Sequence, residues 1–305
     1  MKIFIILLSF TCMATVHSQQ AHVSSGAITR YDNFPSKFVK PRNVDVWLPD
    51  GYSFKQKYTV LYMHDGQMLF DSATTWNKSE WGVDETLKKL HDDNEIRDCI
   101  IVAIWNIPEK RFADYFPEKI IQYIPEPTRT EILTKQIKGI PGADNYLKFI
   151  VTELKPFIDS NYSTQADVDN TFIIGSSMGG LISAYAVCEY PAVFGGAACL
   201  SIHSPLAAFE LINDKTNEDV ASKFRDYLVE NLPPANTRKF YFDYGDQTGD
   251  SLYKPYQTGI DQVMKQKGYT EKYWVTKFFP GENHSEKSWA KRLYIPILFL
   301  VKKLC

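Results

Sequence analysis

The sequence predicts an α/β fold in which a mostly parallel sheet carries helices on both faces. Short strand-like runs alternate with segments of helical spacing along most of the chain. One of these runs, residues 100–105, is apolar throughout, as is typical of parallel strands that are covered on both faces. No linker rich in proline, glycine or serine and no internal repeat divides the 305 residues, so we expect a single large domain.

The first 18 residues are typical of a secretory signal peptide. Lys2 precedes an apolar run, and small and polar residues follow up to Ser18, after which we expect cleavage. The apolar run is too short to span a bilayer as a helix, and no later stretch is long enough for a membrane span. We therefore expect a secreted or periplasmic protein that comprises residues 19–305, which is 305 − 18 = 287 residues.

The composition of this mature chain argues against two kinds of partner. Removal of Lys2 leaves a formal charge of 33 − 36 = −3, which gives no electrostatic reason to expect nucleic acid. No metal-ligand spacing is present, and Cys99 and Cys199 lie in apolar runs where cysteine acts as a small hydrophobic residue. We therefore expect no metal, no cofactor and no required disulfide, while the oligomeric state stays open.

Three strands are predicted in the first third of the chain. Residues 44–48 end at the turn sequence Pro49-Asp50-Gly51, and residues 58–63 end at His64-Asp65-Gly66. The third strand is the apolar run at residues 100–105. Between the second and third strands, residues 81–90 have the apolar spacing of a helix.

The middle of the chain interrupts this alternation. Residues 108–141 are rich in proline and aromatic residues and have no clear place in it, and long insertions of this kind are often functional. We expect this insertion to form a lid or a wall of a substrate cleft. Residues 146–158 resume the pattern as an amphipathic helix, because Phe149, Ile150, Leu154 and Phe157 share one face.

The remaining elements complete the sheet and its cover. Strands are predicted at residues 171–174, 195–202, 239–244 and 273–279, and helices at residues 181–187 and 289–303.

The most informative motif is Gly175-Ser176-Ser177-Met178-Gly179, which lies between a predicted strand and a predicted helix. A strand that leads into Gly-x-Ser-x-Gly and then a helix forms the nucleophile elbow of the α/β-hydrolase fold. In this elbow a strained turn projects the central serine from the top of the sheet. The motif therefore predicts an α/β-hydrolase fold with a mostly parallel eight-stranded sheet, and Ser177 as the nucleophile.

A serine nucleophile needs a general base, and histidine is the usual one. In this fold the triad follows the order serine, acid, histidine along the chain. His203 and His284 both follow Ser177, but only His284 leaves room for an intervening strand that carries the acid. His284 is therefore the predicted base.

The acid should follow the strand at residues 239–244, where three carboxylates compete. Asp243 lies inside the predicted strand, whereas Asp246 and Asp250 lie on the loop that follows it. Sequence spacing does not separate Asp246 from Asp250.

An oxyanion needs preorganised N–H donors. One donor should be the backbone N–H of Met178, directly after the nucleophile. The second should come from the loop His64-Asp65-Gly66-Gln67, where glycine allows the backbone to approach a substrate closely.

Taken together, residues 62–67, 175–180 and 281–284 resemble the esterase D/enterochelin-esterase-like "putative esterase" group of α/β-hydrolases, which includes acetyl and feruloyl esterases of carbohydrate esterase family 1. The resemblance covers nearly the whole mature chain. It extends to the following positions: Trp81, Asn106, Arg111, Tyr115-x-Pro117 and Trp289-x-x-Arg292.

The resemblance implies a role for each residue of the site. It implies Ser177 as nucleophile, His284 as base and the N–H groups of Gln67 and Met178 as the oxyanion hole. It favours Asp250 as the acid, followed by an aromatic residue such as Tyr253. Other members carry the acid where Thr248 stands, so Asp246 is kept as the reserve.

These inferences predict a secreted serine esterase that acts on acetyl or feruloyl groups of polysaccharides or oligosaccharides through an acyl-enzyme. Six further residues are candidates for the substrate cleft: His64, Trp81, Trp105, Arg111, Tyr115 and His203. The alternatives are a siderophore esterase, an acyltransferase that uses the same triad, and a non-catalytic binding protein of the same fold.

Overall fold

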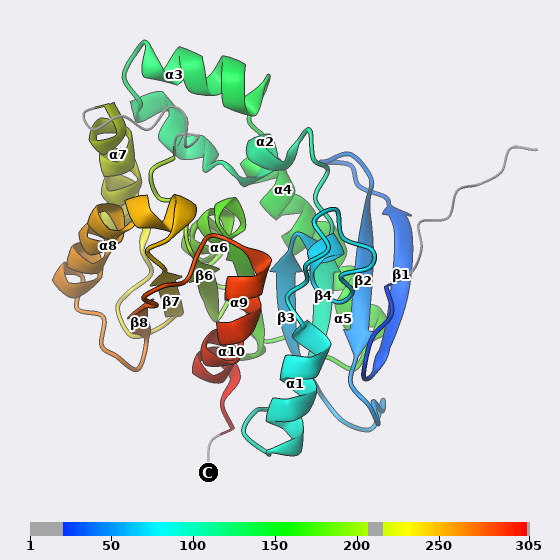
Figure 1. Cartoon of the computed structure of the whole chain (residues 1–305). Helices are drawn as coiled ribbons and strands as arrows, with labels where there is room; N and C mark the ends of the chain where they lie inside the picture. Colours follow the sequence, from blue (N-terminus) through cyan, green and yellow to red (C-terminus); the bar gives the residue numbers. More distant parts are fainter. Residues whose placement is uncertain (1–20, 207–215, 304–305) are drawn as a thin grey trace, which may run out of the picture.

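The computed structural model describes residues 21–206 and 216–303, and they form an eight-stranded sheet with helices on both faces (Figure 1). The predicted signal peptide at residues 1–18 lies outside the described residues. The strands are β1 (Ala27–Phe34), β2 (Arg42–Leu48), β3 (Thr59–His64), β4 (Cys99–Ile104), β5 (Thr171–Ser176), β6 (Gly196–Leu200), β7 (Lys239–Tyr244) and β8 (Trp274–Phe278).

The α-helices are α1 (Val83–Asp92), α2 (Arg111–Tyr115), α3 (Thr128–Glu131), α4 (Ala143–Phe149), α5 (Lys155–Asn161), α6 (Met178–Glu189), α7 (Thr216–Asn231), α8 (Lys254–Gln266), α9 (Glu286–Arg292) and α10 (Tyr294–Val301). Short 3-10 helices lie at η1 (Gly66–Met68), η2 (Glu118–Tyr123), η5 (Val168–Asn170) and η7 (Thr248–Leu252), and π-helical turns at η3 (Ile132–Ile137) and η4 (Ile150–Leu154).

The strand order in the sheet is β1-β2-β4-β3-β5-β6-β7-β8. β1 and β2 pair antiparallel, as do β2 and β4, and every later pair is parallel. The predicted α/β-hydrolase fold with a mostly parallel eight-stranded sheet is therefore confirmed. In this register Ser176 lies opposite Leu200, and Leu200 lies opposite Asp243, so the residues that follow β5, β6 and β7 emerge at one edge of the sheet.

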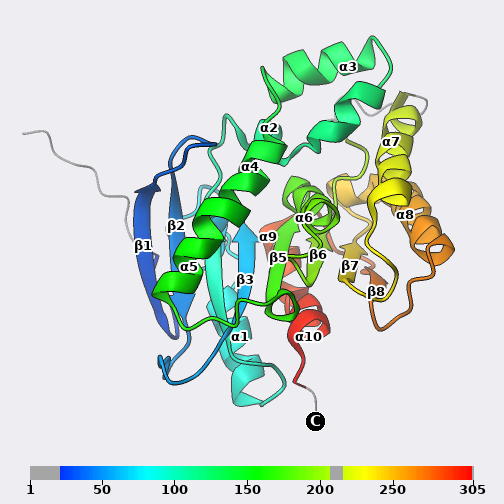
Figure 2. The same cartoon turned by 180° about the vertical axis from the view of Figure 1, so that it is seen from behind.

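Two hydrophobic cores lie on the two faces of this sheet. One face is covered by α1, α9 and α10 (Figure 1), whose core residues include Leu87, Trp289 and Ile297. The other is covered by α4, α5 and α6 (Figure 2), and α6 is buried on nearly all sides, as expected for an apolar helix in the centre of an α/β protein.

The structure differs from the predicted elements where local sequence carries a weak or mixed signal. β1 is an edge strand with several polar residues, and it was not predicted, nor were α7 and α8. The helix predicted at residues 289–303 is divided into α9 and α10, because Pro296 has no N–H to donate to the carbonyl of Arg292. The helix predicted at residues 146–158 is interrupted by the π-helical turn η4.

The insertion at residues 108–141 is more ordered than its composition suggests. It folds as α2, η2, α3 and η3, and it buries Tyr115, Phe116, Ile120 and Ile132 against the core that contains α6. Arg111 at the start of α2 reaches the cavity described below, so part of the insertion forms a wall, as expected.

Cys99, Cys188 and Cys199 are buried and carry free thiols, while Cys305 lies outside the described residues. Among the helices formed by residues 21–206 and 216–303, none combines the length and apolar character that crossing a bilayer requires.

Candidate active site

The turn between β5 and α6 holds Ser177 in a strained conformation. Ser177 has φ 55° and ψ −122°, which an L-residue adopts only where the surrounding structure enforces it. A Cβ at Gly175 would lie 2.5 Å from the backbone of Gly179, so only glycine fits where the helix passes the strand. The local geometry is that of a nucleophile elbow.

His284 and Asp250 meet at the same edge of the sheet. His284 lies between β8 and α9, Asp250 lies in η7 after β7, and His284 Nδ1 is 2.7 Å from Asp250 Oδ1. The Asp250 side chain is fully buried, and its second oxygen accepts hydrogen bonds of 2.7 Å from the Gly245 N–H and from Ser201 Oγ.

The protonation state of Asp250 follows from these contacts. Burial by itself raises the pKa of this carboxyl, but the interactions with His284, Ser201 and Gly245 outweigh burial and lower the pKa below its ordinary value. Asp250 is therefore an ionised carboxylate at neutral pH, which suits it to orient an imidazole and stabilise its cation.

The two other carboxylates of this region have different partners. Asp243 is buried in β7 and forms a salt bridge with Arg292, with Arg292 Nη2 2.9 Å from Asp243 Oδ1. Asp246 accepts the Gly281 N–H at 2.8 Å. Of the three carboxylates that the sequence left in competition, Asp250 is the one that the structure places on the imidazole of His284.

A buried network lies behind Asp250. The hydroxyl of Ser201 accepts hydrogen bonds from Trp289 Nε1 at 3.0 Å and from Arg292 Nη2 at 2.9 Å, while it donates to Asp250. Ser201 itself has φ 42°, and its N–H donates to Asp243 Oδ1 at 3.0 Å. The network thus ties the ends of β6 and β7 to α9.

Two backbone N–H groups lie where an oxyanion hole is expected. Met178 is the first residue of α6, and Gln67 lies in η1, so both N–H groups belong to a first helical turn, where intrahelical acceptors are lacking. The side chain of Gln67 accepts the N–H of Asn106 at 3.2 Å. Asp65, directly before η1, has the left-handed φ of 56° that starts this turn.

Asp65 anchors the loop that leads into η1 to the insertion. Arg111 donates to both carboxylate oxygens of Asp65, from Nε at 2.9 Å and from Nη2 at 2.7 Å, and Asn106 Nδ2 donates to Oδ1 at 2.6 Å. Burial raises the pKa of Asp65, but the guanidinium of Arg111 and the Asn106 amide outweigh it, so the pKa lies below its ordinary value. This bidentate pair fixes the loop through the chain that follows β4.

Ser177 and His284 open into one cavity of about 680 Å³. It is lined by Asp65, Gln67, Met68, Trp76, Asn77, Trp81, Asn106, Pro108, Arg111, Ser176, Ser177, His284, Ser285, Glu286 and Trp289. Trp81 and Arg111 are thus two of the six predicted cleft residues that border the cavity.

The other four predicted cleft residues lie elsewhere, and for them the structure corrects the prediction. His64 is buried, with Nδ1 2.8 Å from the Tyr146 hydroxyl, and Tyr115 is buried beside it. The indole of Trp105 donates to Asp45 Oδ2 at 2.9 Å, on the side of the sheet near β1. His203 is buried, with Nδ1 2.8 Å from the hydroxyl of Tyr253.

Tyr253 nevertheless connects His203 to Ser177. Burial and the charge of Asp250 raise the pKa of Tyr253, while a hydrogen bond with the side chain of Ser177 acts in the opposite direction. His203 therefore lies behind Tyr253: it follows a strand, as predicted, but, contrary to the prediction, it does not border the cavity.

Sequence reasoning missed five residues of the cavity wall and one of the supporting network. The five wall residues lie outside the motifs, and only an aromatic side chain among them offered any signal: Met68, Trp76, Asn77, Ser285 and Glu286. Ser201 stands at the end of a predicted strand, but its partners are 49 and 91 positions away along the chain.

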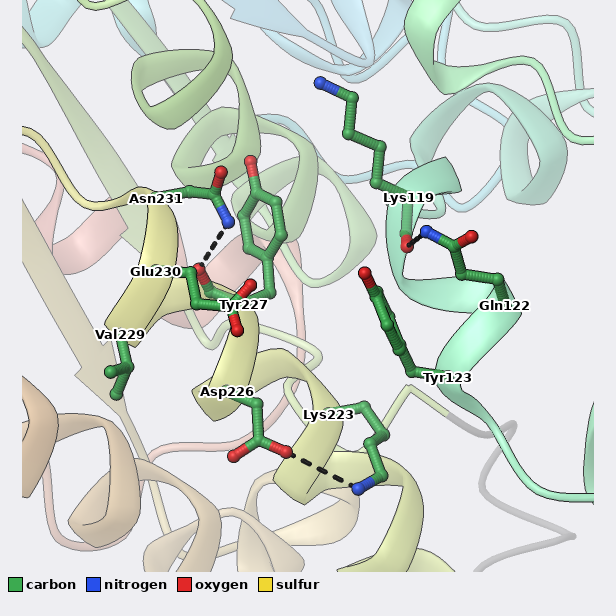
Figure 3. Close-up of a pocket in the computed structure, with 9 residues that line it drawn as sticks. All are labelled: Lys119, Gln122, Tyr123, Lys223, Asp226, Tyr227, Val229, Glu230 and Asn231. Atoms are coloured by element: carbon green, nitrogen blue, oxygen red, sulfur yellow. Dashed lines mark hydrogen bonds and ion pairs between the residues drawn. The ribbon is translucent and has the colours of Figure 1, made fainter.

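A second cavity of about 440 Å³ lies between η2 and α7 (Figure 3). Its lining includes Tyr123, Lys223, Asp226 and Tyr227, with an ion pair of 3.4 Å between Lys223 and Asp226. It contains none of the residues that the sequence predicted for the site. Within residues 21–206 and 216–303, no group of three or more His, Cys, Asp or Glu side chains could hold a metal ion.

The chain matches a protein family and is similar to several known proteins. A family model described as "Putative esterase" matches residues 36–298. The uncharacterized protein YbbA of Bacillus subtilis is 24% identical over 272 residues, which cover 86% of this chain and 93% of that protein.

Two solved structures show the same fold. A CE1 ferulic acid esterase from Anaeromyces mucronatus is similar with a TM-score of 0.61, 17% identity and 92% of each chain covered. The enterobactin esterase of Shigella flexneri is similar with a TM-score of 0.60 and 14% identity, over 93% of this chain and 61% of that one.

Proposed function

The chain belongs to the "Putative esterase" family, and from this premise we propose that it is a serine esterase that hydrolyses carboxylic esters through an acyl-enzyme. One observation carries the proposal: Ser177 and His284 line the same cavity, and the imidazole of His284 is 2.7 Å from the buried carboxylate of Asp250.

In the proposed reaction, Ser177 Oγ attacks the ester carbonyl carbon while His284 takes the hydroxyl proton. Asp250 holds the Nδ1–H side of the ring and stabilises the imidazolium. The N–H groups of Gln67 and Met178 receive the developing oxyanion. The tetrahedral intermediate then collapses, and His284 gives its proton to the departing alcohol oxygen.

Water completes the cycle. His284, neutral again, removes a proton from a water molecule that attacks the acyl carbonyl. The second tetrahedral intermediate then breaks its bond to Ser177 Oγ, which takes the proton back from His284 as the carboxylic acid is released. This step needs the same base and the same oxyanion hole, so no further residue is required.

For the substrate we propose acetyl or feruloyl esters of polysaccharides or oligosaccharides. The similarity of the fold to a ferulic acid esterase supports this proposal, as do Trp81 and Trp289, whose rings pack 5.6 Å apart in the cavity wall. The enterobactin esterase has a similar fold, so a siderophore ester is the alternative substrate.

We further propose that the chain is exported and that residues 19–305 act as one domain. The charge pattern and apolar run of residues 1–18 support a signal peptide, although these residues lie outside the described structure.

The test is acid release from p-nitrophenyl acetate, methyl ferulate, acetylated xylan and a catecholate siderophore by the mature protein and by Ser177→Ala. We expect the variant to lose a factor on the order of 10⁵–10⁶ in kcat. Ser160→Ala is the matched control, because that exposed hydroxyl is bonded only to the local Pro156 carbonyl in this structure and lies outside the cavity. Equal rates for Ser177→Ala and the unaltered protein would overturn the assignment.

A further inference from the structure

Trp76 is an exposed indole on the wall of the catalytic cavity. Its side chain borders the same cavity as Ser177 and His284, yet the residue is 83% exposed to solvent. Trp81 and Trp289, which also border the cavity, are 2% and 5% exposed. An indole left in water at the mouth of a catalytic cavity offers a flat apolar surface that a bound ring could cover.

The loop that carries Trp76 is held in place by its neighbours. The Ser79 N–H donates to Thr75 Oγ1 at 3.0 Å and to Asn77 Oδ1 at 3.1 Å, and Thr75 is itself buried. Asn77 Nδ2 donates to Glu286 Oε2 at 2.8 Å. The indole is therefore presented by an anchored loop, which lowers the entropic cost of using it as a binding surface.

The hydrogen bond between Asn77 and Glu286 indicates which part of a bound ester Trp76 would contact. Glu286 begins α9 two residues after His284, so the Asn77–Glu286 hydrogen bond joins the loop to the segment that carries the base. In ester cleavage the base hands its proton to the departing alcohol oxygen, so the alcohol lies beside His284. Trp76 therefore stands on the alcohol side of the scissile bond.

The charges on the cavity wall limit the kind of alcohol that fits. Asp65 and Glu286 are acidic and Arg111 is basic. Nε and Nη2 of Arg111 already donate hydrogen bonds to the carboxylate of Asp65. The wall thus carries no surplus of positive charge that would favour an anionic group. The amides of Gln67, Asn77 and Asn106 add polar groups that suit hydroxyls.

We propose that Trp76 forms the subsite for the leaving alcohol, and that this alcohol is an uncharged sugar ring whose apolar face packs on the indole while its hydroxyls meet the polar wall. The inference rests on the proposed esterase function and adds to it a residue that selects the alcohol rather than the acyl group.

The experiment compares two esters of the same acid with different alcohols: methyl ferulate and a feruloylated arabinose. Trp76→Ala should lower kcat/KM for the sugar ester about tenfold more than kcat/KM for the methyl ester, chiefly through KM, because one ring face loses its apolar partner. Trp76→Phe should restore most of the difference. Phe54→Ala is the matched control, since Phe54 is also an exposed aromatic residue, at 73%, but lies away from this cavity.

Three outcomes would overturn the inference. Equal losses on both esters would show that Trp76 supports the site without contacting the alcohol. A larger loss on the methyl ester would place the indole on the acyl side. A wild-type preference for an anionic catecholate siderophore over the sugar ester would contradict the sugar subsite, while leaving the esterase proposal intact. Failure of the wild type on every ester is a separate result, which would remove the esterase proposal together with this inference.

Discussion

Ser201 donates a hydrogen bond of 2.7 Å to Oδ2 of Asp250, and His284 is held by the other oxygen of the same carboxylate. The two oxygens of the proposed triad acid are thus divided between the base and a buried support. Because Trp289 and Arg292 both donate to Ser201, the orientation of the acid depends on residues of α9, which follows His284 directly.

Ser201→Ala should lower kcat, because Ser201 orients the proposed triad acid. The carboxylate of Asp250 would lose a buried charge-assisted hydrogen bond, worth about 1.5–3 kcal/mol, and its preferred orientation toward His284. We expect kcat to fall about tenfold to a hundredfold with KM little changed, and the pH profile of kcat to shift. Steady-state kinetics from pH 5 to 9 measure this, with Ser160→Ala beside it. An equal kcat in both variants would mean that Ser201 does not position the acid.

Arg292→Met should be strongly destabilising. Arg292 is 2% exposed and pairs with the fully buried Asp243, so its removal leaves a buried carboxylate without its countercharge. The expected loss is about 3–5 kcal/mol in the free energy of unfolding, measured by urea denaturation. The double variant Arg292→Met/Asp243→Asn should recover part of this loss, because the uncompensated charge is gone. A single-variant loss below about 1 kcal/mol would contradict a structural role for the pair.

Asp250→Asn and Asp246→Asn separate the two loop carboxylates that sequence spacing left in competition. Asparagine at position 250 keeps the shape of the side chain but cannot hold the imidazole in the same tautomer, so kcat should fall by a factor of about 10⁴. Asp246→Asn should change kcat less than about threefold, since its carboxylate caps the Gly281 N–H instead. Burst and steady-state assays on p-nitrophenyl acetate give both numbers, and a reversed ranking would move the triad acid to Asp246.

Much of the fold could be predicted because the signals are local. A strand that leads into Gly175-Ser176-Ser177-Met178-Gly179 requires close approach of strand and helix, and the contact between Gly175 and Gly179 shows why. β1 escaped prediction because a polar edge strand shows little of the apolar pattern that marks a buried one.

The place of a candidate site residue could be predicted where it follows from the order of the elements along the chain. It could not be predicted where it depends on the direction in which the side chain points. His64 ends β3, one residue later than the predicted strand, and its ring turns into the core toward Tyr146 and away from the cavity. The role of Ser201 could not be predicted, because no local sequence pattern links positions 201 and 250. It follows only from the strand register, which places Leu200 beside Asp243. Trp76 lies in an irregular loop, and the periodicity of the sequence does not predict where the residues of such a loop lie.

His64 should make the stability of the fold depend on pH below neutrality. Burial lowers the pKa of its imidazole from the ordinary value of 6.5 to about 3, so the folded protein keeps His64 neutral at pH values where the unfolded chain protonates it. The unfolded state then binds more protons, and protonation favours unfolding. The contribution of neutral His64 is complete above about pH 6.5 and is lost as the pH falls toward 3.

His64→Asn removes this titration and can still pair with the Tyr146 hydroxyl. Urea denaturation at pH 4.5, 5.5, 6.5 and 7.5 should give a free energy of unfolding whose slope below pH 6 is smaller in the variant, by up to about 1.4 kcal/mol per pH unit. Removing the exposed imidazole of His91 by His91→Asn controls for the loss of a surface histidine. The predicted difference lies in the slope of the free energy of unfolding against pH. A packing defect in His64→Asn would instead lower the free energy of unfolding at every pH and leave that slope unchanged. Parallel curves for the wild type and His64→Asn would show that His64 takes up its proton equally in the folded and unfolded states, against the burial seen here.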